Sequence, residues 1–476
     1  MGAGAAGLYS ALVAAGDGAR VALVSRSPLP QTASYWAQGG IAAAVSLEDS
    51  PERHLADTVA AGRGAVRESA ARVLCEDSPD RLRELEALGV RFDADRSGAL
   101  ALGLEGGHSV RRVAHAGGSA TGRRITRELS ALVATHRLIE VLEPATAEAL
   151  WLGDGRCVGV VVRSAGGEWL QVHARATVLA TGGMAALWER STNPPSAVGW
   201  GIALAMEAGS TLADLELTQF HPTALAVGGP RDGFLITEAV RGEGARLLNA
   251  RCERFVDELA PRDEVALAVE SELRSSGEQA VLLDMRDIDL ERFPNITATL
   301  AEVGIDPRRE PVPVAPAAHY TIGGVATDID GRSSLQGLYA VGECACTGLH
   351  GANRLASNSL AECLVFGRRA ALAAALEPTA PATPGPPPTS TDATTPGSGT
   401  RRALWRLAGL VRSANGLREL ASDPFPLARL ISAACLAREE SRGVHRRTDY
   451  PETDPTLDRM HVTVRLGSEP SLERWD

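Results

Sequence analysis

The chain has 476 residues, 44% of them hydrophobic and 22% charged, which is enough apolar material for about two to four domains. All 48 residues counted as Lys or Arg are Arg, and the absence of Lys excludes both a Walker-type phosphate loop and a Schiff-base lysine. The net charge of −11 argues against a nucleic-acid partner. No apolar run approaches the roughly 18 residues that a membrane span needs, so no membrane partner is expected.

The seven Cys residues contain no CxxC pair, so we predict neither a metal site nor a disulfide framework. This pattern indicates a reducing compartment, and we expect a cytoplasmic location. The apolar N-terminus lacks a basic start, and we interpret it as part of the fold and not as a signal peptide.

The N-terminal segment predicts a glycine turn, a helix over residues 7–15 and a strand over 20–25. The turn, Gly2-Ala-Gly4-Ala-Ala-Gly7, matches GxGxxG, and its bare amides before a helix can hold a pyrophosphate, although the short motif alone is a weak signal. Such a turn normally follows a buried strand, so we expect either a true start upstream of Met1 or the loss of that strand. The strand ends at Ser25-Arg26 instead of the acidic residue of NAD sites, which leaves NADP or another dinucleotide open.

Later segments continue an α/β pattern. Helical spacing is present at 68–88 and 263–276, and valine-rich stretches between 150 and 175 predict a small antiparallel sheet. Two β-rich runs, at 176–181 and 337–341, lead into glycines, as strands do where an open α/β sheet exposes its backbone to a nucleotide.

The clearest boundary is the segment from 377 to 400, which holds seven of the 27 Pro and should be an extended linker. The segment from 401 to 447 has Leu, Ala and Arg at helical spacing and predicts a small helical domain, which we expect to end in coil from Thr448 onward.

Several local patterns in a fixed order are far more specific than any one of them. They are Ala33-Ser-Tyr-Trp-Ala-Gln-Gly-Gly40, Glu105-Gly-Gly-His-Ser109, Gln219-Phe-His-Pro-Thr223, Thr237-Glu-Ala-Val-Arg-Gly-Glu-Gly244, Leu259-Ala-Pro-Arg-Asp263, His319-Tyr-Thr-Ile-Gly-Gly324, Gly342-Glu343 and Gly351-Ala-Asn-Arg-Leu-Ala-Ser-Asn-Ser-Leu360. This order resembles the fumarate reductase and succinate dehydrogenase flavoprotein family, and within it most closely the L-aspartate oxidases. The resemblance covers nearly the whole chain.

The resemblance implies an α/β fold with non-covalent FAD as the cofactor. A Rossmann-like FAD-binding domain of the glutathione-reductase type would carry an inserted α+β capping domain and a C-terminal helical domain. We expect the FAD-binding domain at 1–224 and 318–376, the capping domain at 225–317, the Pro-rich linker at 377–400 and the C-terminal domain at 401–476.

Two Arg and two His, in motifs with Pro or Gly and therefore expected on turns, suit a small dicarboxylate: Arg262, Arg354, His221 and His319. Arg binds carboxylates through two parallel hydrogen bonds, and neutral His donates hydrogen bonds without adding a fixed charge. With 48 Arg in the chain, ordinary structural ion pairs are the alternative explanation.

The resemblance assigns a role to each of these residues. His221, Thr237, His319 and Arg354 would bind the substrate carboxylates, and Arg262 would be the catalytic residue that moves a proton in the fumarate-reducing direction. Glu105 would face the α-amino group that distinguishes L-aspartate from succinate, unless it is a solvated loop residue. Glu238 either assists Arg262 or is a structural partner of Arg241.

The resemblance also places the flavin contacts. The pyrophosphate falls to the glycine loop, Glu343 to the ribityl or ribose part, and Ser359 with Leu360 to the electron-rich end of the ring, where a helix dipole stabilises the reduced anion. The full set is Gly2, Ala3, Gly4, Ala5, Ala6, Gly7, Arg26, Ala33, Ser34, Gln38, Gly39, Gly40, Glu343, Ser359 and Leu360.

The sequence departs from the family in two places. Ala33 stands where respiratory relatives attach flavin through His, which predicts a non-covalent flavin. Trp200 stands between two glycines where many relatives have an Asp that contacts flavin. Replacing this Asp by Trp removes a polar contact.

The implied reaction is the oxidation of L-aspartate to iminoaspartate with oxygen or fumarate as electron acceptor, the first step of de novo NAD biosynthesis. The implied partners are small dicarboxylates, with quinolinate synthase taking the unstable imine onward. Two alternatives remain open: a fumarate reductase or succinate dehydrogenase subunit, and a non-catalytic flavoprotein relative.

Overall fold

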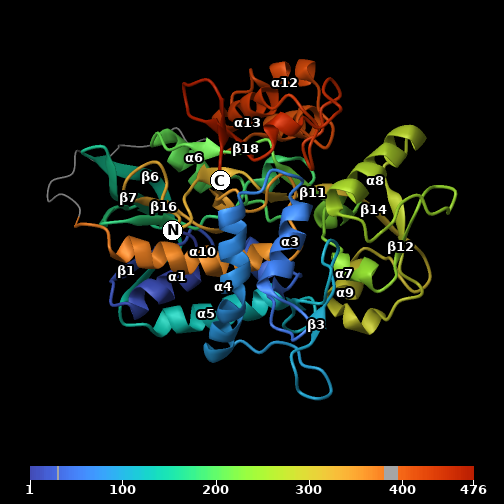
Figure 1. Cartoon of the computed structure of the whole chain (residues 1–476), viewed down its shortest axis with the longest axis horizontal. Coiled ribbons are helices and arrows are strands. Elements are labelled where there is room, and N and C mark those ends of the chain that lie inside the picture. Colours follow the sequence, from blue (N-terminus) through green and yellow to red (C-terminus); the bar gives the residue numbers. More distant parts are fainter. Residues whose placement is uncertain (29–31, 380–394) are drawn as a thin grey trace.

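Parallel strands covered by helices form the nucleotide-binding part of the chain (Figure 1). The computed structural model describes residues 1–28, 32–379 and 395–476. The strands of this part are β1 (Val21–Val24), β5 (Ile139–Leu142), β9 (Thr177–Leu179) and β16 (Leu338–Ala340). Its helices are α1 (Ala5–Gly16), α2 (Ala33–Trp36), α3 (Pro51–Ala61), α4 (Glu68–Ala87), α5 (Thr121–Thr135), α6 (Trp200–Glu207) and α10 (Asn358–Ala375). The three strands and the two helices predicted in this part are confirmed to within a few residues.

Two parallel strand pairs, β1–β5 and β9–β16, meet at the first two residues. The Gly2 amide donates to the Val24 carbonyl at 2.8 Å, and the Ala180 amide donates to the Met1 carbonyl at 2.8 Å. The glycine turn therefore lies between the carboxyl ends of β1 and β9, where an open α/β sheet binds its ligand.

Glycine is required in the turn for steric reasons. Gly2 has φ of +101°, and a Cβ there would lie 2.2 Å from the Ala180 carbonyl oxygen. At Gly7, inside α1, a Cβ would lie 1.9 Å from the Gly2 carbonyl oxygen. The helix can thus begin directly against the turn only because both positions lack a side chain.

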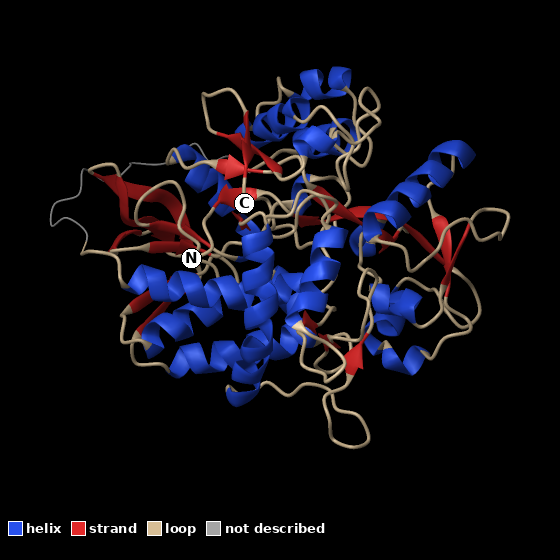
Figure 2. Cartoon of the chain, viewed as in Figure 1, coloured by secondary structure: helices blue, strands red, loops and turns tan. Residues whose placement is uncertain are grey.

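Two small antiparallel sheets flank this core. The predicted antiparallel excursion is a three-stranded sheet in the order β6-β7-β8, formed by β6 (Ala145–Gly153), β7 (Arg156–Ser164) and β8 (Trp169–His173). A second, shorter sheet has the order β2-β4-β3, from β2 (Ile41–Ala42), β3 (Leu102–Gly103) and β4 (Val113–Ala114). In Figure 2 the strands at the left of the view, labelled β6 and β7 in Figure 1, lie beside the layer of helices.

The inserted region is an antiparallel sheet with short helices, at the yellow-green side of Figure 1. Its strands are β11 (Thr218–Leu225), β12 (Arg246–Leu248), β13 (Val281–Asp284) and β14 (Val312–Thr321), in the order β11-β14-β13-β12. Its helices are α7 (Glu238–Gly242), α8 (Arg262–Ser276) and α9 (Pro294–Glu302). The expected domain limits at 225 and 317 fall within β11 and β14, which pair with each other, so the chain enters and leaves this region along one two-stranded ribbon.

The C-terminal region combines helices with strands. It contains α11 (Ser398–Leu407), α12 (Ala414–Leu420), α13 (Pro426–Ala437), β18 (Met460–Val464) and β19 (Ser471–Arg474). The expectation of coil from Thr448 onward is therefore wrong: these two strands extend a sheet of order β17-β15-β10-β18-β19, whose other members are β10 (Leu212–Ala213), β15 (Gly324–Ala326) and β17 (Ala345–Cys346). Both strands are short, and β18 joins the sheet through β10, which lies about 250 residues earlier in the chain, so local pattern does not reveal the pairing.

Most of the predicted Pro-rich linker lies outside the described residues, which resume at residue 395, and α11 begins before the expected boundary at 401. Within the part of the chain that the structure describes, no helix is long and apolar enough to cross a membrane.

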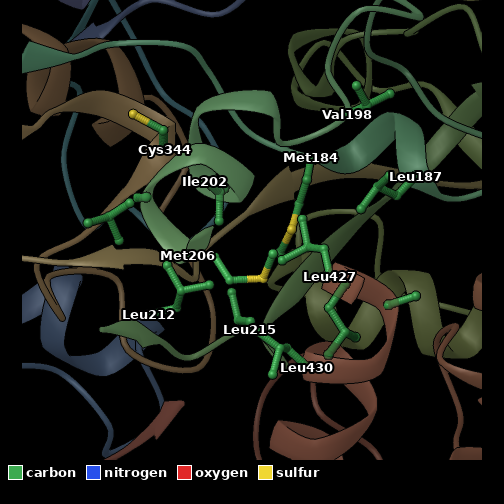
Figure 3. Packing of buried hydrophobic residues seen from close by; sticks show 14 of the residues in the cluster. Met184, Leu187, Val198, Ile202, Met206, Leu212, Leu215, Cys344, Leu427 and Leu430 are labelled. Carbon is green, nitrogen blue, oxygen red and sulfur yellow. The ribbon is translucent and has the colours of Figure 1, made fainter. Parts of the chain in front are cut away.

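One apolar cluster joins the nucleotide-binding part to the C-terminal region. Figure 3 shows Met184, Ile202 and Met206 packed toward Leu427 and Leu430 of α13. Trp188 is fully buried in the same cluster, and its indole nitrogen donates to the Ala408 carbonyl at 3.0 Å. The C-terminal region is therefore packed into the body of the protein through a shared core.

Candidate active site

A cavity of about 540 Å³ lies between the glycine turn, the antiparallel sheet β6-β7-β8 and the inserted region. Nearly all residues that the sequence singled out line it: Gly2, Ala3, Gly4, Ala6, Arg26, Ala33, Ser34, Gln38, Gly39, Gly40, Glu105, His221, Thr237, Arg262, His319, Glu343, Arg354, Ser359 and Leu360. Ala5 and Gly7 do not line it, because they lie inside the first turns of α1, where the Ala5 amide donates to Ser34 Oγ at 3.1 Å.

Two helices begin at the cavity without a side-chain cap. Gly4 precedes α1 and Ser357 precedes α10, and neither makes a side-chain capping hydrogen bond. The first amides of a helix carry partial positive charge and bind anions when no side chain caps them. Apart from the Ala5 amide, which donates to Ser34 Oγ, the first amides of these two helices can therefore serve as donors to anionic parts of a ligand.

Unpaired buried atoms point to a bound group as well. Gln38 Oε1 and Thr181 Oγ1 are buried without a hydrogen-bond partner, and both residues line the cavity. Burial raises the pKa of Glu343 to about 7, so this carboxyl can be neutral and donate a hydrogen bond to a ligand hydroxyl. The residues present therefore fit FAD.

Trp200 and Ala33, the two positions at which the sequence departs from the family, both line the cavity. Trp200 donates from its indole nitrogen to the Ala147 carbonyl at 2.7 Å, and the Arg26 guanidinium lies 5.5 Å from the centre of its ring. Trp200 thus brings an aromatic face and a satisfied donor in place of a carboxylate. Ala33 is the first residue of α2 and has no atom that could bond covalently to a flavin.

Gln219 joins Arg262 and Arg354. The sequence showed Gln219 only as part of a motif and gave it no role. Gln219 Oε1 accepts from Arg354 Nη2 at 3.1 Å and from Arg262 Nη1 at 3.4 Å. Arg354 forms no ion pair among the described residues, and its remaining contacts are Ser359 Oγ at 3.3 Å and the face of Tyr320, 4.4 Å from guanidinium carbon to ring centre. Burial, and then Arg262, lower the pKa of Arg354 to about 10, so it stays charged and lacks a carboxylate.

The two predicted histidines lie side by side within the strands β11 and β14, so the expectation that they stand on turns is wrong. The rings of His221 and His319 are 5.1 Å apart, and His319 Nδ1 is 2.8 Å from Thr192 Oγ1. Burial, and then the charge of Arg262, hold the pKa of both rings well below 6.5. Both imidazoles are therefore neutral near pH 7 and act as hydrogen-bonding groups.

Glu105 is a buried carboxylate and not a solvated loop residue. It accepts from Ser357 Oγ at 2.8 Å, and His115 Nε2 lies 3.5 Å from it. Burial alone would raise its pKa, but His115, Arg262 and Ser357 outweigh burial and lower the pKa to about 2. Glu105 thus brings a buried negative charge to a cavity that Arg262 and Arg354 also line.

Glu238 contacts both Arg262 and Arg241, the two partners that the sequence left open. Its Oε2 accepts from Arg262 Nε at 2.5 Å and lies 3.4 Å from Arg241 Nη2. Burial opposes ionisation, but Arg262 and Arg241 lower the pKa of Glu238, which remains an anion. The three side chains form a continuous ionic chain that leads away from the cavity.

The sequence did not predict three further residues near the site, Tyr320, Glu362 and His350, because tertiary contacts alone bring them together. Tyr320 stacks on Arg354 and donates to Glu362 at 2.5 Å, and Glu362 is also 2.9 Å from His350 Nε2. Tyr320 follows His319 directly, so its motif was visible, but nothing in the sequence pairs it with a Glu on α10.

Comparison with known proteins agrees with this geometry. The FAD binding domain family matches residues 1–360, and the fumarate reductase flavoprotein C-terminal family matches residues 421–473. The L-aspartate oxidase of Caulobacter vibrioides is 46% identical over 99% of this chain and 96% of its own length. That of Streptomyces coelicolor is 42% identical over 99% of this chain and 92% of its own length.

Solved structures give the same fold. A single-residue variant of E. coli quinol fumarate reductase FrdA superposes with a TM-score of 0.90 at 29% identity, covering 100% of this chain and 95% of that one. Mycobacterium smegmatis Sdh1 in complex with UQ1 superposes with a TM-score of 0.84 at 30% identity, covering 99% and 93%.

These matches confirm the predicted fold class and FAD as the cofactor. The solved structures that share the fold include a fumarate reductase chain, whereas the sequence relatives that match over nearly their whole length are L-aspartate oxidases. By fold, cavity and sequence, this chain belongs to the L-aspartate oxidase family of FAD-binding flavoproteins.

Proposed function

We propose that the protein oxidises L-aspartate to iminoaspartate with FAD. The observation that carries the proposal is the charge arrangement of the cavity: Arg262 and Arg354 line it together with the buried, ionised Glu105. Two cations suit the two carboxylates of a small diacid, and one anion suits an α-ammonium group. Succinate and fumarate have no ammonium group for that carboxylate to bind.

In this proposal the carboxylates are bound by Arg354, His221, His319 and Thr237. Arg354 has no anionic partner within the described residues, so its charge is available for a ligand. The neutral imidazoles can donate hydrogen bonds to the second carboxylate without adding charge. Gln219 Oε1 accepts from both guanidinium groups and so sets the distance between Arg354, which would bind the substrate, and Arg262, the proposed proton donor.

The flavin would be held by the glycine turn of residues 2–7 together with Arg26, Ala33, Ser34, Gln38, Gly39, Gly40, Glu343, Ser359 and Leu360. When bound, FAD supplies the hydride acceptor for the Cα–H bond of the substrate. Because Ala33 offers no covalent attachment, denaturation should release the FAD.

In the reverse, fumarate-reducing direction, Arg262 would hold and deliver a proton from its guanidinium. An arginine is a weak acid, and a proton lost from it is most readily replaced through a neighbour. Glu238 Oε2 lies 2.5 Å from Arg262 Nε, and Arg241 lies behind Glu238, so the proton can return along this chain.

Oxygen or fumarate would serve as electron acceptor, and the step would open de novo NAD biosynthesis. Iminoaspartate hydrolyses in water, so direct use by quinolinate synthase belongs to the same proposal. We also propose a cytoplasmic location, where the imine would form beside the enzyme that consumes it.

A fumarate reductase or succinate dehydrogenase role is the second candidate, favoured by the TM-score of 0.90 to quinol fumarate reductase. The arginines and histidines suit either diacid, whereas the ionised Glu105 favours the amino diacid.

The test is anaerobic mixing of the purified yellow protein with L-aspartate or with succinate. We expect L-aspartate to bleach the flavin absorption band and succinate to leave it nearly unchanged. Bleaching by succinate and not by L-aspartate would support the respiratory role, and absence of a flavin band even after addition of FAD would support a non-catalytic relative.

A further inference from the structure

Three parts of the chain that are distant in sequence meet at the start of α8. Asp263, the residue after Arg262, accepts two hydrogen bonds from Arg63: from Nε to Oδ2 and from Nη2 to Oδ1, both at 3.1 Å. Arg63 Nη2 also donates to Glu264 Oε1 at 2.5 Å. Arg446 of the C-terminal region lies 3.9 Å from Asp263 Oδ2.

The contact between Arg63 and Asp263 differs from an ordinary surface pair. The Asp263 side chain is fully buried, and Arg63 is 30% exposed. The two parallel hydrogen bonds match the planar guanidinium to the carboxylate, which is the strongest and most directional form of ion pair. Without Arg63, this buried carboxylate would lose both hydrogen bonds and keep only the more distant Arg446, at 3.9 Å, so its position would no longer be fixed.

The C-terminal region also holds the backbone at Arg63 in place, through hydrogen bonds to two carbonyl groups. Arg442 Nη1 donates to the Arg63 carbonyl at 2.6 Å, and the Arg459 amide donates to the Gly64 carbonyl at 2.9 Å. Arg442 is in turn fixed by Glu440 at 2.8 Å, and both are buried. Arg63 itself has φ of +55°, so its loop is held in a conformation that a free loop would leave.

We propose that Arg63 and Asp263 form a clasp that positions Arg262. This inference rests on the proposed role of Arg262 in proton delivery. Arg262 and Asp263 are the first two residues of α8, so whatever fixes the Asp263 carboxylate also fixes the backbone from which the Arg262 guanidinium reaches Glu238 and Gln219. Arg63 and Asp263 are positioning residues, since neither lines the cavity.

Loss of the clasp should act on the proton step more than on binding. Arg354, His221 and His319 lie on other elements and retain their positions, so a dicarboxylate still binds. A displacement of Arg262 by about 1 Å lowers the rate of a step that depends on its geometry by roughly ten- to a hundredfold.

The experiment compares holoenzyme variants Arg63→Met and Arg63→Lys with a matched control, Arg274→Met. Arg274 lies on the same helix and pairs with Glu270 at 2.6 Å, on its exposed side and away from the cavity. We expect Arg63→Met to lower kcat for fumarate reduction by about ten- to a hundredfold and to raise its solvent isotope effect. The Kd of succinate, read from the flavin spectrum, should change by less than about threefold.

Arg63→Lys keeps the positive charge but cannot form the two parallel hydrogen bonds, so its kcat should lie between those of Arg63→Met and the parent protein. The kcat of Arg274→Met should match that of the parent protein. Arg63→Met combined with Asp263→Asn should be no slower than Arg63→Met alone, because the pair acts as one unit. If Arg63→Met yields no folded flavoprotein, the same comparison applies to Arg63→Lys.

The proposal is overturned if the Arg63 variants differ from Arg274→Met by less than about twofold in kcat, far below the loss that a misplaced catalytic group causes. It is equally overturned if kcat, succinate affinity and unfolding midpoint all fall in parallel, which would make the clasp merely structural. Parent protein that is not reduced by L-aspartate would instead count against the proposed function, so the two failures are distinguishable.

Discussion

At the scale of single residues, the proposed role of Glu105 is to distinguish an amino diacid from a diacid without an amino group. Glu105→Gln keeps the shape and removes the charge, so it should lower kcat/KM for L-aspartate by about 10- to 150-fold, the worth of a charge-assisted hydrogen bond of roughly 1.5–3 kcal/mol. Fumarate reduction should stay nearly intact. The two rates measured on one preparation check this, and a parallel loss of both activities, or of neither, contradicts the assignment.

The two cavity arginines should differ in what their loss does. Arg354→Leu removes a guanidinium that has no anionic partner among the described residues, so turnover should become unmeasurable and succinate binding should weaken by about tenfold or more. Arg262→Leu should suppress fumarate reduction more strongly than it weakens succinate binding. Steady-state kinetics combined with spectral titration of succinate separates the two effects, and equal losses for Arg262 would make it a binding residue.

The two neutral histidines predict how binding depends on pH. Protonation of either ring would add positive charge beside a dianion, so affinity would rise as pH falls through the imidazole pKa. Because burial and Arg262 hold both pKa values well below 6.5, this rise lies on the acid side. We expect the Kd of succinate to vary by less than about threefold between about pH 8 and 6.5, and a tenfold tightening over that range would show that a histidine titrates there.

At the scale of elements, the packing of α1 on the glycine turn has a direct test. In Gly7→Ala the new Cβ would lie 1.9 Å from a backbone oxygen that cannot rotate away. The turn must shift, which should cost about 1–3 kcal/mol in unfolding free energy and weaken FAD binding.

Gly16→Ala is the matched control, since it ends the same helix with nothing within 4 Å of its Cβ and should be neutral or slightly stabilising. Urea unfolding and FAD fluorescence titration give both quantities. Equal effects of the two substitutions would show that the close approach at Gly7 is unimportant.

Elements with a strong local pattern were predictable, and those defined by distant contacts were not. The periodicity of 68–88 and 263–276 predicted α4 and α8 nearly to the residue, because amphipathic spacing is a local property. The strands β18 and β19 were missed, because the pairing of β18 with β10 joins residues about 250 positions apart.

The candidate site shows the same division. Ordered motifs were enough to predict that Arg262, Arg354, His221 and His319 meet in one cavity. Only the two arginines lie at or shortly before a helix start, whereas the two histidines lie within strands. The bridging amide of Gln219 and the contact of Tyr320 with Glu362 depend on the angle at which β11, β14 and α10 meet, which residue spacing does not encode.

At the scale of the whole molecule, the shared apolar cluster predicts one cooperative unit. Leu427 is fully buried in α13 and packs against the segment before α6, where a Gly199 Cβ would lie 2.9 Å from its Cδ2. Leu427→Ala should lower the unfolding free energy by about 2–5 kcal/mol. The transitions seen by circular dichroism and by FAD release should move together.

Leu466→Ala, at a C-terminal position that is 50% exposed, should change the stability by less than about 0.5 kcal/mol. Two separate transitions in Leu427→Ala, with FAD release unchanged, would mean that the C-terminal region unfolds on its own.

The paired strands β11 and β14 attach the inserted region to the rest of the chain. Two loops would let that region swing in any direction, whereas hydrogen-bonded strands resist sliding along each other and yield mainly by bending out of their plane. His221 and His319 are carried on the ribbon itself. Bending the ribbon would therefore move both imidazoles together. A diacid bound between them and Arg354, as proposed, would resist that bending and make the site around it more rigid.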